Sequence, residues 1–320
     1  MVPEAGFRSY YGRPVLKAPV WKVPDVPAYL YLGGLAGVSA PLAALADLTG
    51  RPRLRRIGRL AAAGGAGASV AFLVHDLGRP ARFLHMLRVF KVTSPLSVGS
   101  WILAPFGTLA GATAAAELLG VAPRLARASG AAAGALGPAL VTYTAALLAD
   151  TAVPAWHEAY RYLPFLFAGS ALAAGGGAGL LAPDAREARP ARVVAVAGAG
   201  LELAAAAAIE RRTGFAARAY RTGRAGAVLR AARAGTVAGA AGALAAGLVR
   251  GRRTRRALDV AAAVLLNAAS AATRYGVFEA GRASARDPEY TVRVQRERMA
   301  TAGTGEDRPG PEHRTQVAGR

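Results

Sequence analysis

The chain of 320 residues contains no cysteine. Cysteine thiolates hold iron–sulfur clusters, attach c-type haem and form disulfides, so this chain alone can build none of these. Histidine is also scarce, with four in all. One pair, His75 and His157, stays open as an alternative ligand set for a single haem b. Our expectation is that the chain carries no haem, no iron–sulfur cluster and no other metal of its own.

Acidic residues are few: 19 Asp and Glu face 40 Lys and Arg, for a formal net charge of +21. Such an excess can indicate nucleic-acid binding. Here, however, the bases gather in short clusters between apolar runs, for example Arg51–Arg59 and Arg250–Arg256. Bases in that position typically flank membrane spans, so we expect no nucleic-acid partner. The first 27 residues hold bases and prolines but no apolar run, so no cleavable signal peptide is visible.

Long runs of Ala, Gly, Leu and Val are what the chain does have. A bilayer core about 30 Å thick is crossed by about 20 such residues. We therefore predict an all-α integral membrane protein, a bundle of eight transmembrane helices at 28–47, 58–77, 97–119, 133–152, 162–182, 191–210, 234–249 and 257–278. The predicted organisation is an extramembrane N-terminal segment (1–27), a transmembrane domain (28–280) and a polar, flexible C-terminal tail (281–320).

An even number of spans places both termini on one side of the membrane. His75, Asp150 and Arg274 each stand about 26 Å along a helix axis from the start of their span, which places them at one depth near that side. Tyr29 enters from the same side. Ionisable residues inside a membrane are costly and suggest a functional site. A polar pocket at this depth suits a lipid-soluble ligand with a polar head, such as a quinone. The basic loops do not decide which side this is.

Simpler explanations compete at each position. In the stretch "FLVHDLGRPARFLHML" (Phe72–Leu87), Gly78 can end a helix and Asp76 can pair with Arg79. Glu202 and Arg274 can pair with each other inside the bundle. Tryptophans and tyrosines can form an aromatic belt at the membrane surface; these are Trp21, Trp101, Trp156, Tyr29 and Tyr31. Carboxylates at the span ends, beside arginine clusters, are expected to be solvated: Asp47, Glu117, Glu210 and Asp259.

Three stretches resemble a known family: "VPAYLYLGGLAG" (Val26–Gly37), "HDLGRPARFLHMLRVFKVTSPLSVGSWIL" (His75–Leu103) and "YTAALLADTAVPAWHEAYRYLPFLFAGSALAAGGG" (Tyr143–Gly177). Together they resemble the NrfD-type, or polysulfide-reductase-type, membrane subunits of respiratory molybdoenzyme complexes. The resemblance implies an eight-helix subunit in two four-helix halves. It also implies a quinone (menaquinone or ubiquinone), a ferredoxin-like iron–sulfur partner and a molybdopterin catalytic subunit, of polysulfide reductase or formate dehydrogenase type.

Onto this chain the resemblance places Tyr29 and Tyr143 against the quinone head, with Asp76 and Arg79 in a loop beside the docking face. We expect proton relay by His75, Asp76 or Asp150, because quinone reduction takes up protons. Arg79 lines the pocket or its rim, while Arg82, Glu202 and Arg274 serve partner docking or intramembrane pairing.

Together these features predict a quinone-binding membrane anchor in the bacterial cell membrane. It would exchange electrons between the quinone pool and the iron–sulfur partner. Two alternatives stay open. Buried ionisable residues also suit a proton-coupled transporter, although internal repeats are not evident. A purely structural anchor would assemble with its partner without a working quinone site.

Overall fold

The computed structural model describes residues 15–17, 19–79 and 81–303, and within them there is helix but no strand. Eight helices of at least 17 residues form the body: α1 (Asp25–Leu48), α2 (Pro52–Leu77), α4 (Pro95–Leu119), α5 (Pro123–Ala149), α7 (Leu163–Gly179), α8 (Ala185–Arg212), α10 (Gly223–Leu248) and α11 (Arg252–Arg286). Shorter helices connect or follow them: α3 (Ala81–Met86), α6 (Pro154–Glu158), η1 (Gly214–Ala217), α9 (Arg218–Arg221) and α12 (Pro288–Gly303).

Six of these helices are long and apolar enough to cross a membrane: α1, α2, α4, α5, α8 and α11. The prediction of an all-α, multi-pass membrane protein is thus confirmed. Each of the eight predicted spans falls on one of the long helices. However, α7 is a shorter apolar helix, and α10 carries Arg224, Arg230 and Arg233 in its first half. The number of spans therefore stays a prediction.

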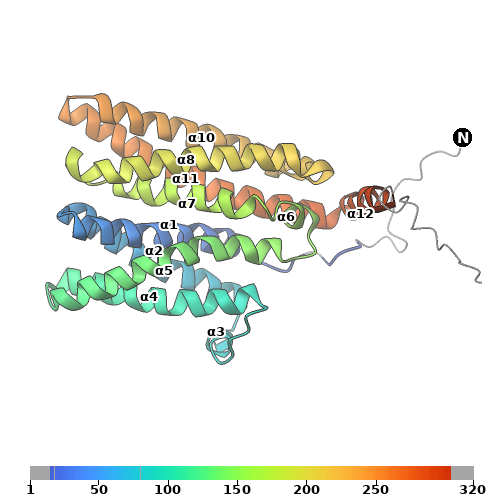
Figure 1. The fold of residues 1–320 in the computed structure, drawn as a ribbon, viewed down its shortest axis with the longest axis horizontal. Helices are drawn as coiled ribbons and strands as arrows, with labels where there is room; N and C mark the ends of the chain where they lie inside the picture. The colour runs from blue at the N-terminus through green and yellow to red at the C-terminus, as the bar shows by residue number, and fades with distance from the viewer. Residues whose placement is uncertain (1–14, 18, 80, 304–320) are drawn as a thin grey trace, which may run out of the picture.

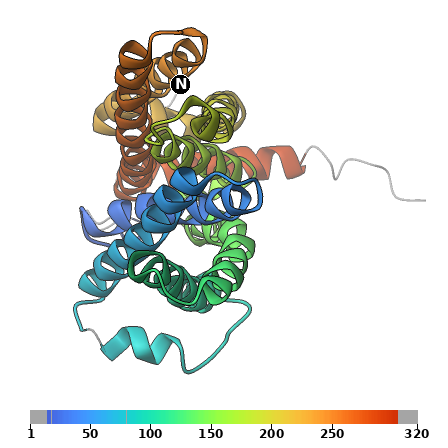
Figure 2. The same cartoon turned by 90° about the vertical axis from the view of Figure 1, so that its left-hand side faces the viewer.

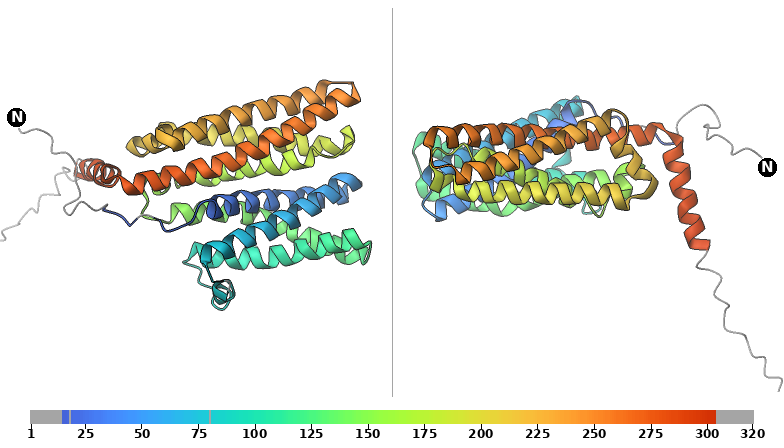
Figure 3. Two further views of the ribbon diagram at one scale, coloured as in Figure 1. Left: turned by 180° about the vertical axis from the view of Figure 1, so that it is seen from behind. Right: turned by 90° about the horizontal axis from the view of Figure 1, so that it is seen from above.

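The predicted start of the C-terminal tail, residue 281, lies inside α11. This helix continues to Arg286 and is followed by α12, which turns away from the line of α11 (Figure 3). Residues 304–320 of that predicted tail lie outside the described residues, and its flexibility stays a prediction.

Local sequence explains where the helices begin and end. Proline occupies the first position of α2, α4 and α5, where its missing N–H is not needed. Ser94 precedes α4, and its hydroxyl accepts the Ser97 N–H. Glycines end α2 and α4 with left-handed backbone, Gly78 at φ +73° and Gly120 at φ +68°. The connections at 49–51, 120–122, 180–184 and 249–251 are short, so the helices that they join run antiparallel as hairpins. The other three connections are longer and contain the short helices α3, α6, η1 and α9.

The long helices form two groups of four. One group is α1, α2, α4 and α5; the other is α7, α8, α10 and α11 (Figures 1 and 2). Packing of α7 against α1 and α5, and of α11 against α1, joins the two groups. Within the first group α1 and α5 touch backbone to backbone, since a Cβ on Gly137 would lie 2.2 Å from the Gly37 carbonyl oxygen. We call the end holding α3, α6, α9 and α12 the terminal end, and the end holding the turns 49–51, 120–122, 180–184 and 249–251 the loop end.

At the terminal end, the first three residues of the short helix α6 are buried in the core. Trp156 is fully buried, stacks on Trp21 with ring centroids 5.6 Å apart, and donates its indole N–H to the Val277 carbonyl at 2.8 Å. Tyr220 of α9 donates its hydroxyl to the Ala155 carbonyl at 2.8 Å, and burial raises the pKa of that hydroxyl, so that it stays a neutral donor. The prediction that Trp156 belongs to a surface belt is therefore wrong, because α6 folds inward and carries the ring into the core.

Candidate functional site

Two tyrosines from different helices meet inside the first group. Tyr29 of α1 and Tyr143 of α5 are 3% and 7% exposed, and their hydroxyl groups contact each other. The Tyr143 ring lies against Gly99 of α4, where a Cβ would come within 2.1 Å of the ring. Only glycine leaves room for the ring there. The two hydroxyls that the resemblance assigns to a quinone head are thus brought together by three helices.

A second polar contact lies one turn nearer the terminal end. The Asp25 carboxylate is 2.6 Å from His75 Nδ1, and their side chains are 5% and 74% exposed. With Asp25 as a carboxylate acceptor, His75 donates this bond through Nδ1–H, and Nε2 is the ring nitrogen not used in it. Asp25 precedes Tyr29 by four residues, so both lie on one face of α1. His75 therefore connects the surface with a buried carboxylate beside the tyrosine pair.

Asp25 was not singled out from the sequence. It stands next to Pro24 and close to Pro27 at the start of α1, a position typical of a solvated helix start. Its proline neighbours and its four-residue spacing from Tyr29 were the available signal. Only the packing of α2 against α1 reveals its burial and its bond to His75.

Asp76 has a different partner from the one proposed. Its carboxylate accepts the Lys22 backbone N–H at 2.8 Å, and Lys22 Nζ donates to the His75 carbonyl at 3.1 Å. No ion pair with Arg79 is found in the described part of the chain. Asp76 thus fastens the N-terminal segment onto the end of α2, which places Asp25 against His75.

The remaining predicted residues of the terminal end lie apart from this site. Asp150, at the end of α5, is exposed. Arg79 is exposed, and Arg82 of α3 donates to the Leu77 carbonyl at 3.0 Å. Helix α3 has no buried residue and stands off from the first group (Figure 2).

Glu202 and Arg274 lie inside the second group and do not form a direct ion pair. Thr273 donates to Glu202 at 2.6 Å. Arg274 is fully buried, donates to the Phe167 carbonyl at 2.7 Å and lies over the Phe167 ring at 3.8 Å. It lies beside Gly34 of α1, about 13 Å deeper than Asp25, so the equal depth predicted for His75 and Arg274 is wrong. The reason is that α11 is longer than the predicted span.

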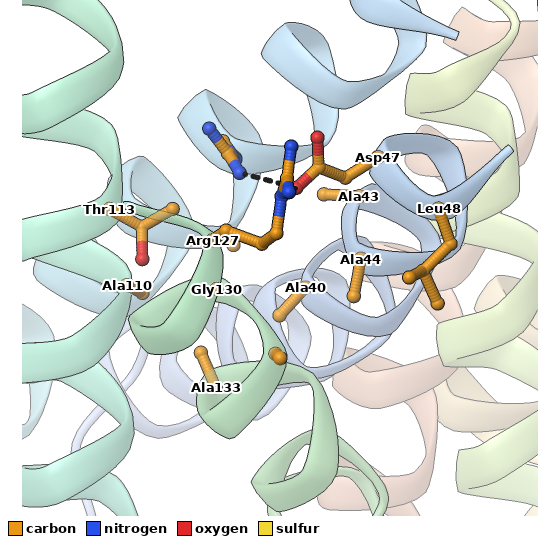
Figure 4. Close-up of a pocket in the computed structure, with 13 residues that line it drawn as sticks. Ala40, Ala43, Ala44, Asp47, Leu48, Ala110, Thr113, Arg127, Gly130 and Ala133 are labelled. Carbon is orange, nitrogen blue, oxygen red and sulfur yellow. Dashed lines mark hydrogen bonds and ion pairs between the residues drawn. The ribbon is translucent and has the colours of Figure 1, made fainter. Parts of the chain in front are cut away.

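The loop end of the first group holds a buried network of charges. Glu117 of α4 and Asp47 of α1 both pair with Arg59 of α2, at 2.6 and 3.2 Å. Arg55 bridges the same two carboxylates, and Arg127 adds a contact to Asp47 at 3.4 Å. Figure 4 shows Arg127 and Asp47 pointing toward each other beside a cavity walled by alanines.

The carboxylates of span ends are therefore not all solvated as predicted. The side chains of Asp47 and Glu117 are 8% and 10% exposed. Asp259 is 4% exposed and pairs with Arg192 at 2.6 Å. Glu210 is partly buried and bonded to Arg233. At the loop end, arginines of neighbouring helices cover Asp47, Glu117 and Asp259, while Glu210 is covered in the same way at the terminal end of α8. The described residues contain no group of three or more His, Asp or Glu suited to hold a metal ion.

Comparison with known proteins bears on these sites. A family model described as "Polysulphide reductase, NrfD" matches residues 15–192. No curated protein matches the chain. The matched range contains Asp25, Tyr29, His75 and Tyr143, whereas Glu202 and Arg274 lie beyond it. Since the match covers more than half of the chain, this protein belongs to the NrfD family, which indicates a membrane subunit of a quinone-linked oxidoreductase complex.

Proposed function

We propose that this chain is the quinone-binding membrane subunit of a respiratory molybdoenzyme complex in the bacterial cell membrane. In it, the chain exchanges electrons between the quinone pool and a ferredoxin-like iron–sulfur subunit. The observation that carries the proposal is the contact between the buried hydroxyls of Tyr29 and Tyr143, one helical turn from the Asp25–His75 pair. The long helices α7 and α10 cross the membrane with the other six.

In the proposed reaction, the chain must provide hydrogen-bond donors to the quinone head and a route for protons. Reducing a quinone to a hydroquinone takes two electrons and two protons. The chain has no cysteine, so the electrons come directly from the partner's cluster. Phenol hydroxyls are suitable donors to a quinone carbonyl oxygen, and the head group would replace the direct contact between Tyr29 and Tyr143. Protons enter at His75 Nε2 and pass to Asp25, which faces the same side of α1 as Tyr29.

The partner subunit docks at the terminal end, on the segment from Arg79 to Ser94. Its side chains expose both charge and apolar surface. Leu84, Val89 and Val92 are 65%, 68% and 73% exposed. Arg79, Arg82, Arg88 and Lys91 add four bases, and no acidic residue occurs between Asp76 and Glu117. A mixed apolar and basic surface of this kind fits an acidic protein partner that brings its cluster close to the tyrosine pair.

Conservative removal of a hydroxyl tests the assignment. Tyr143→Phe and Tyr29→Phe should each lower quinone-linked turnover about tenfold or more, because a hydrogen bond to the head group is lost. Turnover of the catalytic subunit with an artificial electron acceptor should stay unchanged. Tyr31→Phe is the matched control, since Tyr31 lies on the same helix but bonds to Asn267 at 2.8 Å. Equal quinone turnover in all three variants would refute the site.

The buried Glu202 and Arg274 support one competing function, a proton-coupled transporter. Vesicles holding the chain alone distinguish the two. Solute uptake that depends on a proton gradient and is lost in Glu202→Gln would favour the transporter. Lack of uptake, together with quinone-linked turnover in the complex, would favour the proposal. A purely structural anchor predicts normal assembly and no inhibition by quinone analogues.

A further inference from the structure

A groove between α8 and α10 opens at the loop end of the second group, far from the tyrosine pair. The part of the groove nearest the loop end is lined by Arg186, Arg189 and Arg192, which follow one another at three-residue intervals along one face of α8. The part of the groove farther from the loop end is apolar, and its residues Val193 and Leu244 are 63% and 53% exposed. The groove is therefore basic at the membrane surface and apolar below it.

The bases of this groove have few acidic partners. Arg192 is held by Asp259 at 2.6 Å. The two carboxylates that neighbour Arg186 in the sequence are already engaged, because Asp184 pairs with Arg53 and Glu187 accepts the backbone N–H groups of Arg53 and Leu54. No carboxylate within ion-pair distance of Arg186 or Arg189 is found in the described part of the chain. These two exposed guanidinium groups are thus available to bind an anion from outside the chain.

The distances fit a lipid lying along the helix. Val193 follows Arg186 by seven residues, about 10 Å deeper along α8. A phospholipid presents the same sequence of groups: a phosphate at the surface and acyl chains below it. Basic pockets between transmembrane helices bind anionic lipid heads, and arginine bonds phosphate oxygens with two parallel N–H groups.

We propose that the groove between α8 and α10 binds an anionic membrane phospholipid. Arg186 and Arg189 bind the phosphate, and an acyl chain lies over Val193 and Leu244. Arg192, fixed by Asp259, keeps the floor of the basic part in place. The proposal does not depend on the quinone site, because it uses neither the tyrosine pair nor the docking segment.

Native mass spectrometry of the full chain, with any partner that co-purifies, tests this directly. Phosphatidylglycerol and phosphatidylcholine with identical acyl chains are titrated separately. We expect phosphatidylglycerol to bind more tightly and to raise the unfolding temperature more. In Arg186→Gln/Arg189→Gln its affinity should fall roughly 25-fold, about fivefold for each base.

The matched control is Arg56→Gln/Arg124→Gln. Both residues are exposed at the same end and outside the groove, so the charge change is equal. The affinity of this control variant for phosphatidylglycerol should equal that of the wild type. A second variant, Ala197→Trp, fills the apolar part without changing charge and should also displace the lipid.

Three results would overturn the proposal. The first is an equal loss of affinity in the control pair, which would indicate a diffuse charge effect. The second is displacement of the lipid by millimolar inorganic phosphate together with no effect of Ala197→Trp, which would indicate a phosphate site without an acyl seat. The third is a co-purifying protein that covers the groove and excludes lipid from it.

Discussion

At the scale of single residues, proton delivery in the proposed function depends on the buried carboxylate of Asp25. Asp25→Asn keeps the shape of the side chain but removes its charge and its capacity to carry a proton. We expect quinone-linked turnover to fall by about 10²-fold, the usual contribution of a positioned proton-transfer group. Turnover with an artificial electron acceptor, measured on the same preparation, should be unchanged.

Asp76→Asn separates chemistry from positioning at the same end. Asp76 accepts the Lys22 N–H and so holds the segment that carries Asp25. An asparagine oxygen can still accept that bond, so we expect a loss of less than about threefold, as for a hydrogen bond from a neutral group. Asp76→Ala should lose more. Rescue by asparagine is the outcome that distinguishes a positioning residue; an equal loss in both variants would instead make Asp76 a proton carrier.

At the scale of helices, the network at the loop end ties α1, α2 and α4 together. Glu117→Gln leaves the Arg59 guanidinium, 7% exposed, with one carboxylate fewer. Breaking a buried pair from one side costs about 3–5 kcal/mol, a figure that the remaining contact with Asp47 lowers here. We therefore expect about 2–3 kcal/mol less stability in detergent unfolding.

An exposed ion pair at the loop end provides a comparison for this loss of stability. Arg53 and Asp184 are 57% and 53% exposed, so Asp184→Asn should cost no more than about 1 kcal/mol. If Glu117→Gln were as mild as Asp184→Asn, the network would be a set of independent surface pairs.

The helices themselves could be predicted from the sequence because a bilayer leaves the backbone no alternative to internal hydrogen bonds. A run of about 20 apolar residues therefore indicates the presence of a helix, whereas helices such as α11 extend beyond the apolar run at both ends. The contacts between helices could not be predicted in the same way. Asp47 and Glu117 occupy span ends, where water is the usual partner, and only the packing of α2 against α1 and α4 buries them. Asp25 could not be predicted for the same reason, because its burial depends on the packing of α2 against α1.

At the scale of the whole molecule, the two groups of helices differ in what they hold. The first group contains the tyrosine pair, the Asp25–His75 contact and most of the range that matches the family. The second contains Glu202 and Arg274 and the basic groove. The family resemblance named Tyr29 and Tyr143 together, and the structure brings their hydroxyls into contact. The resemblance could not supply the depth of Arg274, which depends on the length of α11.

Photoaffinity labelling with an azido-quinone, followed by peptide mapping, tests the central claim most directly. We expect label on the first turns of α1 around Tyr29 and on α5 around Tyr143, suppressed by excess unlabelled quinone. Labelling confined to α8 and α11 near Glu202 and Arg274, or to the alanine-walled cavity beside Asp47 and Arg127, would contradict the claim and move the quinone elsewhere in the bundle.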